Sequence, residues 1–380
     1  MTNEELLSKT ISYLRFPLTV GVVFIHFNLV NEPLSIHGII YGNNTPYWYN
    51  WIITIISDVI SDIAVPLFFL ISGFLFFYGK DFNTKLYKQK LKTRTRTLLI
   101  PFILWNIIAI IQILIFRLPC LSSIIPSASQ IEIHLSIKRI LLTFFASSYG
   151  IFVSPSTDSL AVINSTTPYP INYPLWFIRD LMVMVLLSPV MHWLIRKTNK
   201  WIIPMLGIIW CLYIPIGCAY FRMLLTAAFF FSWGAYYSIN KKNFVANMRK
   251  YNYFPYFYTP IAILDTLTKG TYYNIYLHNI GIIIGIISSV VIVSNLIDIG
   301  KIKVNETLAN CSFFVYALHG LILSSIGRLI FIVLHLPDIT SAMLFLYFVT
   351  PLLSIVLCII IYVSMKRFTP SICNLLTGGR

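Results

Sequence analysis

The stretch YLRFPLTVGVVFIHFNLV, residues 13–30, decides the class of this fold. It is apolar along most of its length and close to the ~20 residues that an α-helix needs to cross the core of a bilayer. It nevertheless carries Arg15 near its start and His26 near its end. An arginine at the centre of a membrane helix costs roughly 2.5–3.5 kcal/mol on insertion scales, so polar groups kept inside such a segment indicate a function.

The composition extends this interpretation to the whole chain. Of its 380 residues, 57% are hydrophobic and 11% are charged, and the mean hydropathy is +0.78, whereas soluble domains contain about 25% charged residues. We therefore expect an all-α integral membrane protein. The net charge of +15 comes from basic residues clustered between apolar runs, which favours membrane topology over nucleic-acid binding. The six cysteines form no C-x-x-C pair, so we expect neither a disulfide framework nor a metal site.

About ten segments are candidate transmembrane helices when the chain is scanned for apolar spans. They lie at residues 11–30, 52–78, 98–116, 174–195, 201–219, 223–240, 252–268, 274–298, 308–333 and 341–365, and the one at 252–268 is short and polar. No small-residue cleavage site follows the first run, so we expect a retained span and not a signal peptide.

The distribution of lysine and arginine predicts that both termini are cytoplasmic. With that orientation, 21 of the 28 basic residues lie in inner segments and five in outer ones, as the positive-inside rule requires. We expect a single transmembrane domain over residues 1–380. Residues 117–173 form a long extracytoplasmic segment, in which 131–152 is either an amphipathic helix on the membrane surface or a re-entrant segment.

Arg15 and His26 are 11 positions apart, so they lie near one face of a helix and roughly 16 Å apart along its axis. Each has a structural interpretation: Arg15 could extend to the inner interface, and His26 could be a buried residue bonded to a neighbouring helix. In the second span Asp58 and Asp62 are one turn apart, and either carboxylate could orient the imidazole of His26. The same span contains Gly73, which would permit close helix packing.

Other polar residues also lie at the ends of predicted spans. The inner loop before the third span ends with Arg94 and Arg96, which either attract anionic headgroups or hold the phosphates of a cytosolic acyl donor such as acyl-coenzyme A. Candidate supporting residues in the fourth and ninth spans are Trp176, Arg179, Asp180, Tyr316 and His319. Arg179 and Asp180 could instead hold the bundle together, and His319 could be a structural hydrogen-bonding residue.

These motifs, in this order, resemble the acyltransferase 3 family of multi-pass membrane enzymes, which transfer acyl groups, often acetyl, onto carbohydrates of the bacterial surface. The points of likeness are the Arg-x10-His pair, FFLISGF at 68–74, RTRTLLIP at 94–101, PLWFIRDLMVMVLLSP at 174–189 and SFFVYALHG at 312–320. Two departures stand out. Pro66 occupies the place of an acid found in many members, and Arg179 with Asp180 stand where many members carry a glutamate pair.

The resemblance implies an O-acyltransferase in the bacterial cytoplasmic (inner) membrane, with His26 as the catalytic group and Arg15 as its essential partner. It also implies an acyl-CoA donor, most often acetyl-CoA, and a carbohydrate or glycolipid acceptor. Because the sequence ends soon after the tenth span, we do not expect the soluble esterase-like domain that is fused to some relatives. The alternative classes are a proton-coupled transporter or flippase, which the intramembrane His and Asp residues would also suit, and a non-catalytic scaffold. The sequence determines neither the acceptor, the acyl length, the oligomeric state, nor the choice between direct transfer and an acyl-enzyme relay.

Overall fold

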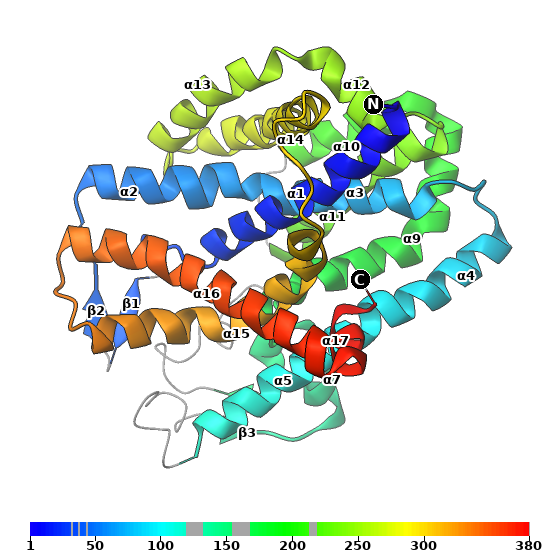
Figure 1. Ribbon diagram of the computed structural model, residues 1–380. Helices are drawn as coiled ribbons and strands as arrows, with labels where there is room; N and C mark the ends of the chain where they lie inside the picture. Colours follow the sequence, from blue (N-terminus) through cyan, green and yellow to red (C-terminus); the bar gives the residue numbers. More distant parts are fainter. Residues whose placement is uncertain are drawn as a thin grey trace.

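The computed structural model describes residues 1–31, 33–36, 39–42, 45–118, 132–153, 168–212 and 219–379. Its longer helices are α1 (Asn3–Ile25), α3 (Ala64–Phe77), α5 (Ile100–Phe116), α9 (Trp176–Thr198), α11 (Ala219–Ile239), α14 (Asn274–Asp298), α15 (Glu306–Val333) and α16 (Thr340–Phe368). The shorter ones are α2 (Tyr47–Thr54), α4 (Thr84–Arg94), α7 (Ile137–Phe145), α10 (Ile202–Cys211), α12 (Phe244–Met248), α13 (Phe254–Leu267) and α17 (Pro370–Thr377). Two antiparallel strand pairs complete the described chain: β1 (Leu34–Ile36) with β2 (Ile39–Tyr41), and β3 (Glu132–Ile133) with β4 (Phe152–Val153). The described chain is a helical bundle (Figure 1).

Six helical stretches among the described residues are long and apolar enough to cross a bilayer. They are Tyr47–Phe77, Thr84–Phe116, Tyr173–Cys211, Asn274–Asp298, Glu306–Val333 and Thr340–Phe368. Each of the ten predicted spans contains a helix, but α10 has 10 residues and α13 has 14, fewer than a crossing needs. The chain is a multi-pass α-helical membrane protein, while the count of ten and the cytoplasmic termini stay predictions.

Two of these stretches contain a π-helix. A π-helix at Ile55–Ile60 and a 3-10 turn at Ser61–Ile63 join α2 to α3. A second π-helix at Thr95–Leu99 joins α4 to α5. Irregular turns of this kind are rare and often occur at functional sites. The first contains Asp58 and the second contains Arg96, so both coincide with candidate site residues.

α3 and α11 pack with their backbones in contact, because a glycine of each helix faces the other. A Cβ atom on Gly73 would lie 2.0 Å from the carbonyl oxygen of Phe231, and one on Gly234 would lie 1.8 Å from that of Leu70. Small residues allow this approach between membrane helices. The expected packing role of Gly73 is thereby confirmed.

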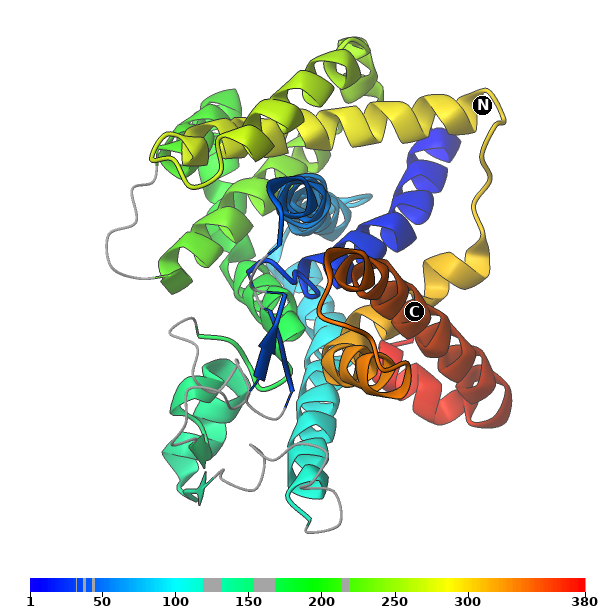
Figure 2. The same ribbon diagram turned by 90° about the vertical axis from the view of Figure 1, so that its left-hand side faces the viewer.

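The N-terminal residues contact the end of α3 and the predicted inner segment 241–250 at one end of the bundle. Asn243 donates to the backbone carbonyl of Asn3 over 2.9 Å, and Tyr78 donates to Glu4. Farther along the chain, Arg249 forms an ion pair with Asp298 at 2.7 Å. In Figure 1 this end, with the N-terminus, α4 and α12, lies to the right, whereas β1, β2 and the start of α2 lie to the left; Figure 2 shows the bundle from that left-hand end.

Candidate active site

His26 follows the last residue of α1 and is held between two aromatic rings. Its backbone N–H donates to the carbonyl of Val22 over 3.3 Å. The half-buried imidazole stacks on His319 of α15, with ring centroids 5.5 Å apart and planes inclined by 26°. Tyr173, from a 3-10 turn at Tyr173–Leu175, meets the same ring edge-on at 4.7 Å. The structure therefore brings together two histidines from opposite ends of the sequence.

His319 is fully buried and presents an unfilled acceptor beside His26. Its Nδ1 lies 3.1 Å from the carbonyl oxygen of Val315. Because a carbonyl oxygen can only accept, Nδ1 carries the proton in this bond, and Nε2 of the neutral ring is an acceptor. Within the described residues, Nε2 has no hydrogen-bond partner. A buried polar atom left in this way costs free energy, which a ligand that donates to it would recover.

The segment before α9 is pressed against α15 next to these histidines. Tyr316 donates its hydroxyl to the carbonyl of Pro174, and the side-chain amide of Asn172 donates to the carbonyl of Ala317 over 3.0 Å. Gly320 permits the close approach, since a Cβ there would lie 2.6 Å from Cγ of Pro174. The motif SFFVYALHG thus builds one wall of the site: its tyrosine, histidine and glycine each have a distinct contact.

Asn172 and Tyr173 are site residues that the sequence patterns above do not single out. The backbone N–H of Asn172 donates to Oδ1 of buried Asn106 over 3.0 Å, while its own Oδ1 is a second buried acceptor with no partner among the described residues. The available signal was the short stretch INY at 171–173 between Pro170 and Pro174. Flanking prolines restrict the backbone and are typical of a rigid turn, not of a helix.

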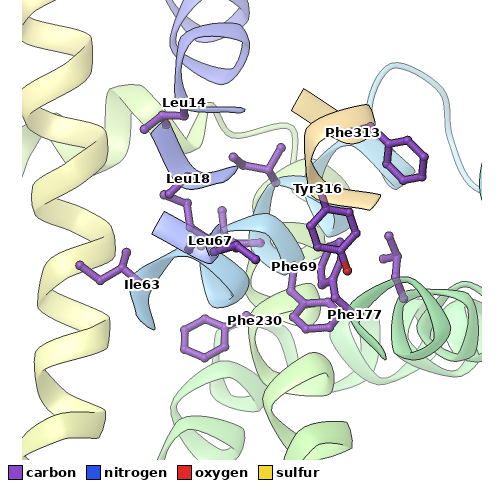
Figure 3. Packing of buried hydrophobic residues seen from close by; sticks show 14 of the residues in the cluster. Leu14, Leu18, Ile63, Leu67, Phe69, Phe177, Phe230, Phe313 and Tyr316 are labelled. Atoms are coloured by element: carbon purple, nitrogen blue, oxygen red, sulfur yellow. The ribbon is translucent and has the colours of Figure 1, made fainter. Parts of the chain in front are cut away.

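Trp176 has a packing position at the start of α9. It is half-buried, and its ring centroid lies 6.4 Å from that of Phe69. Phe177, the next residue, packs on Phe69 at 4.6 Å and on Tyr316 at 6.1 Å. Figure 3 shows the rings of Phe69 from α3, Phe177 from α9 and Tyr316 from α15 close together, with the hydroxyl of Tyr316 beside Phe177. They form an apolar floor that connects α9 to the tyrosine of the wall.

Arg15 lies on α1, 11 residues before His26 and roughly 16 Å nearer the N-terminal end along the helix axis. Its side chain is half-buried. No hydrogen bond or ion pair of its guanidinium is found within the described parts of the chain. A guanidinium at this depth presents a fixed positive charge to any anion that enters the bundle.

The expectation that Asp58 or Asp62 orients His26 is wrong for this structure, because each carboxylate has other partners. Asp58 accepts from the amide of Asn28 at 2.7 Å. Asp62 lies 3.3 Å from Nε2 of His278 on α14. The π-helix and the 3-10 turn around these acids change the direction in which each side chain points, so uniform helical spacing misplaces them.

His278 forms the centre of a charged network separate from the two stacked histidines. Its Nδ1 lies 2.8 Å from Oδ2 of Asp265, which is almost fully buried, and its Nε2 faces Asp62. Lys269 lies 3.3 Å from Oδ1 of Asp265, and Asn274 donates to the same oxygen over 2.8 Å. The network ties the turn between α13 and α14 to the irregular part of the second long stretch, which is a structural role.

Arg179 and Asp180 form a buried ion pair that anchors the outer segment to α9. Nε of Arg179 lies 2.8 Å from Oδ1 of Asp180, and Nη1 donates to the carbonyl of Phe145 over 2.6 Å and to that of Pro168. The guanidinium also lies 4.7 Å from the ring centroid of Tyr220. These contacts connect α7, residue 168 and α11 to α9. The arrangement favours the interpretation of this pair as one that holds the bundle together.

The long outer segment is described in part. α7 exposes Ile137 and Leu141, with 80% and 67% of their surfaces accessible. An apolar face of this kind suits a helix lying on a membrane surface, and that placement stays a prediction. Residues 119–131 and 154–167 lie outside the described residues, as do 213–218 at the end of the fifth predicted span.

Arg94 and Arg96 lie where α4 passes through the π-helix into α5. Arg94 ends α4 and is half-buried, whereas Arg96 is exposed within the π-helix. Lys90, one turn before Arg94, donates to the backbone carbonyl of Phe76. These residues form a basic stretch directly before the apolar helix α5. Among the described residues, no group of three or more His, Cys, Asp or Glu side chains is arranged to hold a metal ion.

Residues 9–363 match the family model described as the acyltransferase domain. The chain belongs to the acyltransferase 3 family. It is also 26% identical over 394 aligned residues to the succinoglycan biosynthesis protein ExoH of Rhizobium meliloti (strain 1021), and the alignment covers 98% of this chain and 92% of that protein. No solved structure matches the chain.

Proposed function

We propose that this protein is a membrane-bound O-acyltransferase that moves an acyl group, in the first instance acetyl, from cytoplasmic acyl-CoA to a hydroxyl of a cell-surface or exported carbohydrate. The observation that carries the proposal is the half-buried imidazole of His26 beside the unfilled acceptor of His319. Family membership supports acyl transfer, and similarity to a succinoglycan biosynthesis protein supports a glycan acceptor. We place the protein in the bacterial cytoplasmic membrane, where an internal donor and an external acceptor can both reach one bundle.

In the proposed chemistry, His26 acts as the general base. Its imidazole takes the proton of the acceptor hydroxyl, the oxygen bonds to the thioester carbonyl carbon, and the carbon–sulfur bond breaks to release the thiol of CoA, which regains a proton. A positioned base of this kind typically contributes a factor of about 10² to 10⁴ in rate. The unfilled Nε2 of His319 would accept a hydrogen bond from a second hydroxyl of the same carbohydrate.

Arg15 would stabilise the negative charge that develops on the carbonyl oxygen or hold the donor, because its charge has no protein partner in the described structure. Arg94 and Arg96 would hold the phosphates of the donor on the cytoplasmic side of the membrane. A relay is the second route: His26 itself is acylated by the donor and then passes the acyl group to the acceptor. Arg15 and His26 lie roughly 16 Å apart along α1. In either route the acyl group would therefore pass between two depths in the membrane.

The experiment is incubation of membranes containing the protein with labelled acetyl-CoA and the cell's own glycan. Label should enter the glycan as an alkali-labile ester, and His26→Ala should lose it while the variant inserts and folds normally. Glycan composition from cells with and without the gene would identify the ester. Normal acylation by His26→Ala would contradict the assignment, and flux of a glycan across the membrane without covalent change would favour the transporter class.

A further inference from the structure

A pocket of about 360 Å³ lies at the end of the bundle that holds the N-terminus. It forms where the first turns of α1, the end of α3, the end of α9 and the turn between α11 and α12 meet. Its size falls within the range of small-molecule sites. Leu7 contributes to its wall and precedes His26 by 19 residues, which is roughly 28 Å along the helix axis. The pocket is therefore distinct from the histidine site.

Positive charge dominates the lining of this pocket. Four basic residues line it, namely Lys80, Arg196, Lys241 and Lys242, against the acids Glu4 and Asp81. Glu4 accepts a hydrogen bond from Tyr78, and Asp81 lies 3.5 Å from Lys241. Lys80, Arg196 and Lys242 therefore have no acidic partner among the described residues, and the lining carries two more positive than negative charges. An excess of this sign selects anionic ligands.

The same pocket offers flat aromatic surfaces. The ring of His192 lies 4.9 Å from that of Phe82 and 6.1 Å from that of Phe77, nearly parallel to the latter at 21°. All three line the pocket. Stacking on such faces is the usual way in which proteins hold a heteroaromatic base without reading its edge. Cations beside aromatic faces are the combination that a nucleotide requires.

Two further features connect the pocket to residues already discussed. The charges of both Lys80, in the pocket, and Arg94 act on Lys90. Lys80, Lys90 and Arg94 therefore form a line of positive charge from the pocket to the arginines of RTRTLLIP. Glu4, Arg15 and His26 follow one another at intervals of 11 residues, and thus lie near one side of α1. A ligand seated in the pocket is on the side of α1 that carries the proposed chemistry.

We propose that this pocket binds the adenosine 3′-phosphate 5′-diphosphate end of the acyl donor. The base stacks on Phe82 and His192, the 3′-phosphate meets Arg196 and Lys80, and the diphosphate follows the positive line towards Arg94. This inference rests on the proposed function, because it assigns the nucleotide end of its donor. The phosphate chemistry would also suit an anionic lipid headgroup, so the experiment must separate the two sources.

The test uses the full-length protein in nanodiscs of phosphatidylcholine, with CoA, dephospho-CoA and adenosine 3′,5′-bisphosphate as the probes in a calorimetric titration. Wild type should bind the bisphosphate, and should bind CoA more tightly than dephospho-CoA. The double variant Lys80→Gln/Arg196→Gln should bind CoA at least tenfold more weakly and no longer distinguish it from dephospho-CoA. Lys250→Gln, an exposed basic residue at the same end outside the pocket, should bind as wild type does.

Several outcomes would overturn the assignment. Wild-type affinity for CoA in the double variant, with normal thermal unfolding, would remove the pocket from donor binding. Competitive displacement of the bisphosphate by phosphatidylglycerol in the nanodisc would assign the pocket to a lipid. His26→Ala should still bind CoA. If it does, and the wild-type protein forms no glycan ester, the proposed function fails while the pocket stands. If the double variant forms ester with an unchanged KM for the donor, the pocket fails while the function stands.

Discussion

The two imidazoles of the site have different surroundings, and this difference determines which changes will be informative. His319 is buried with one nitrogen bonded to its own helix, whereas His26 is half-exposed at a helix end. In the proposed mechanism His26 is therefore the residue that meets the substrate, and His319 would support it by stacking and by its unfilled Nε2. The ring face and the ring nitrogen can be tested separately, because phenylalanine retains only the former.

We predict that His319→Phe keeps the fold but lowers the rate of ester formation at least tenfold. The phenyl ring can stack on His26, but Nε2, the nitrogen that would accept a hydrogen bond from the carbohydrate, is lost. Transfer of labelled acetyl-CoA to glycan is the measurement, with thermal unfolding in detergent as the test of folding. His134→Ala is the matched control, because His134 is an exposed histidine paired only with Glu132 in the described structure. Equal rates for His319→Phe and wild type would remove Nε2 from the mechanism.

Arg15 leads to a second prediction at this scale. Since its guanidinium has no ion-pair partner among the described residues, Arg15→Gln should change the midpoint of thermal unfolding little while abolishing transfer. Arg15→Lys should retain partial activity with a raised KM for the donor, because lysine keeps the charge but loses the planar fork. A large loss of stability in Arg15→Gln, with transfer preserved in the folded fraction, would show a purely structural arginine.

At the scale of elements, the contact of α3 with α11 has the least tolerance for change. Gly73→Ala and Gly234→Ala each place a Cβ within 2.0 Å of a backbone carbonyl of the other helix, which neither helix can relieve by a rotamer change. We predict that either substitution separates the helices and lowers the yield of folded protein severely. Size-exclusion chromatography after mild solubilisation is the measurement.

Gly281→Ala is the control for these glycine variants, because its nearest neighbour would be a side-chain carbon of Ile261 at an ordinary 3.4 Å. It should fold as wild type does. Normal folding of Gly73→Ala would show that α3 and α11 can move apart at little cost, and the interpretation of FFLISGF as a packing motif would fail.

Elements also show where sequence reasoning succeeds and where it stops. Apolar length and glycine placement act locally, so the sequence predicts that helices occur in the ten segments and that Gly73 packs closely. The partners of Asp58 and Asp62 depend on a π-helix and a 3-10 turn that no hydropathy pattern indicates, so these acids point to Asn28 and His278 and not to His26. The pairing of His26 with His319 joins residues nearly 300 positions apart and requires the tertiary structure.

On the scale of the whole molecule, the bundle separates two chemical environments. One end holds the basic pocket and the N-terminus, and the other holds the paired imidazoles, with roughly 28 Å of α1 between Leu7 and His26. The positive-inside bias predicts that the basic end is cytoplasmic, which is the side from which the proposed acyl-CoA donor would come. This polarity predicts that the two substrates enter from opposite sides.

We predict that sealed membrane vesicles acylate glycan only when acyl-CoA is on the side of the N-terminus. Inside-out vesicles should respond to donor added to the medium, whereas right-side-out vesicles should respond only after donor is loaded into their lumen. Protease accessibility of a tag at the N-terminus establishes the orientation of each preparation, and detergent-opened vesicles give the activity expected without a barrier. Since charged CoA cannot cross lipid, activity of right-side-out but not of inside-out vesicles with donor in the medium would mean that the donor reaches His26 from the outer side. Both the topology and the role of the basic end would then have to be reversed.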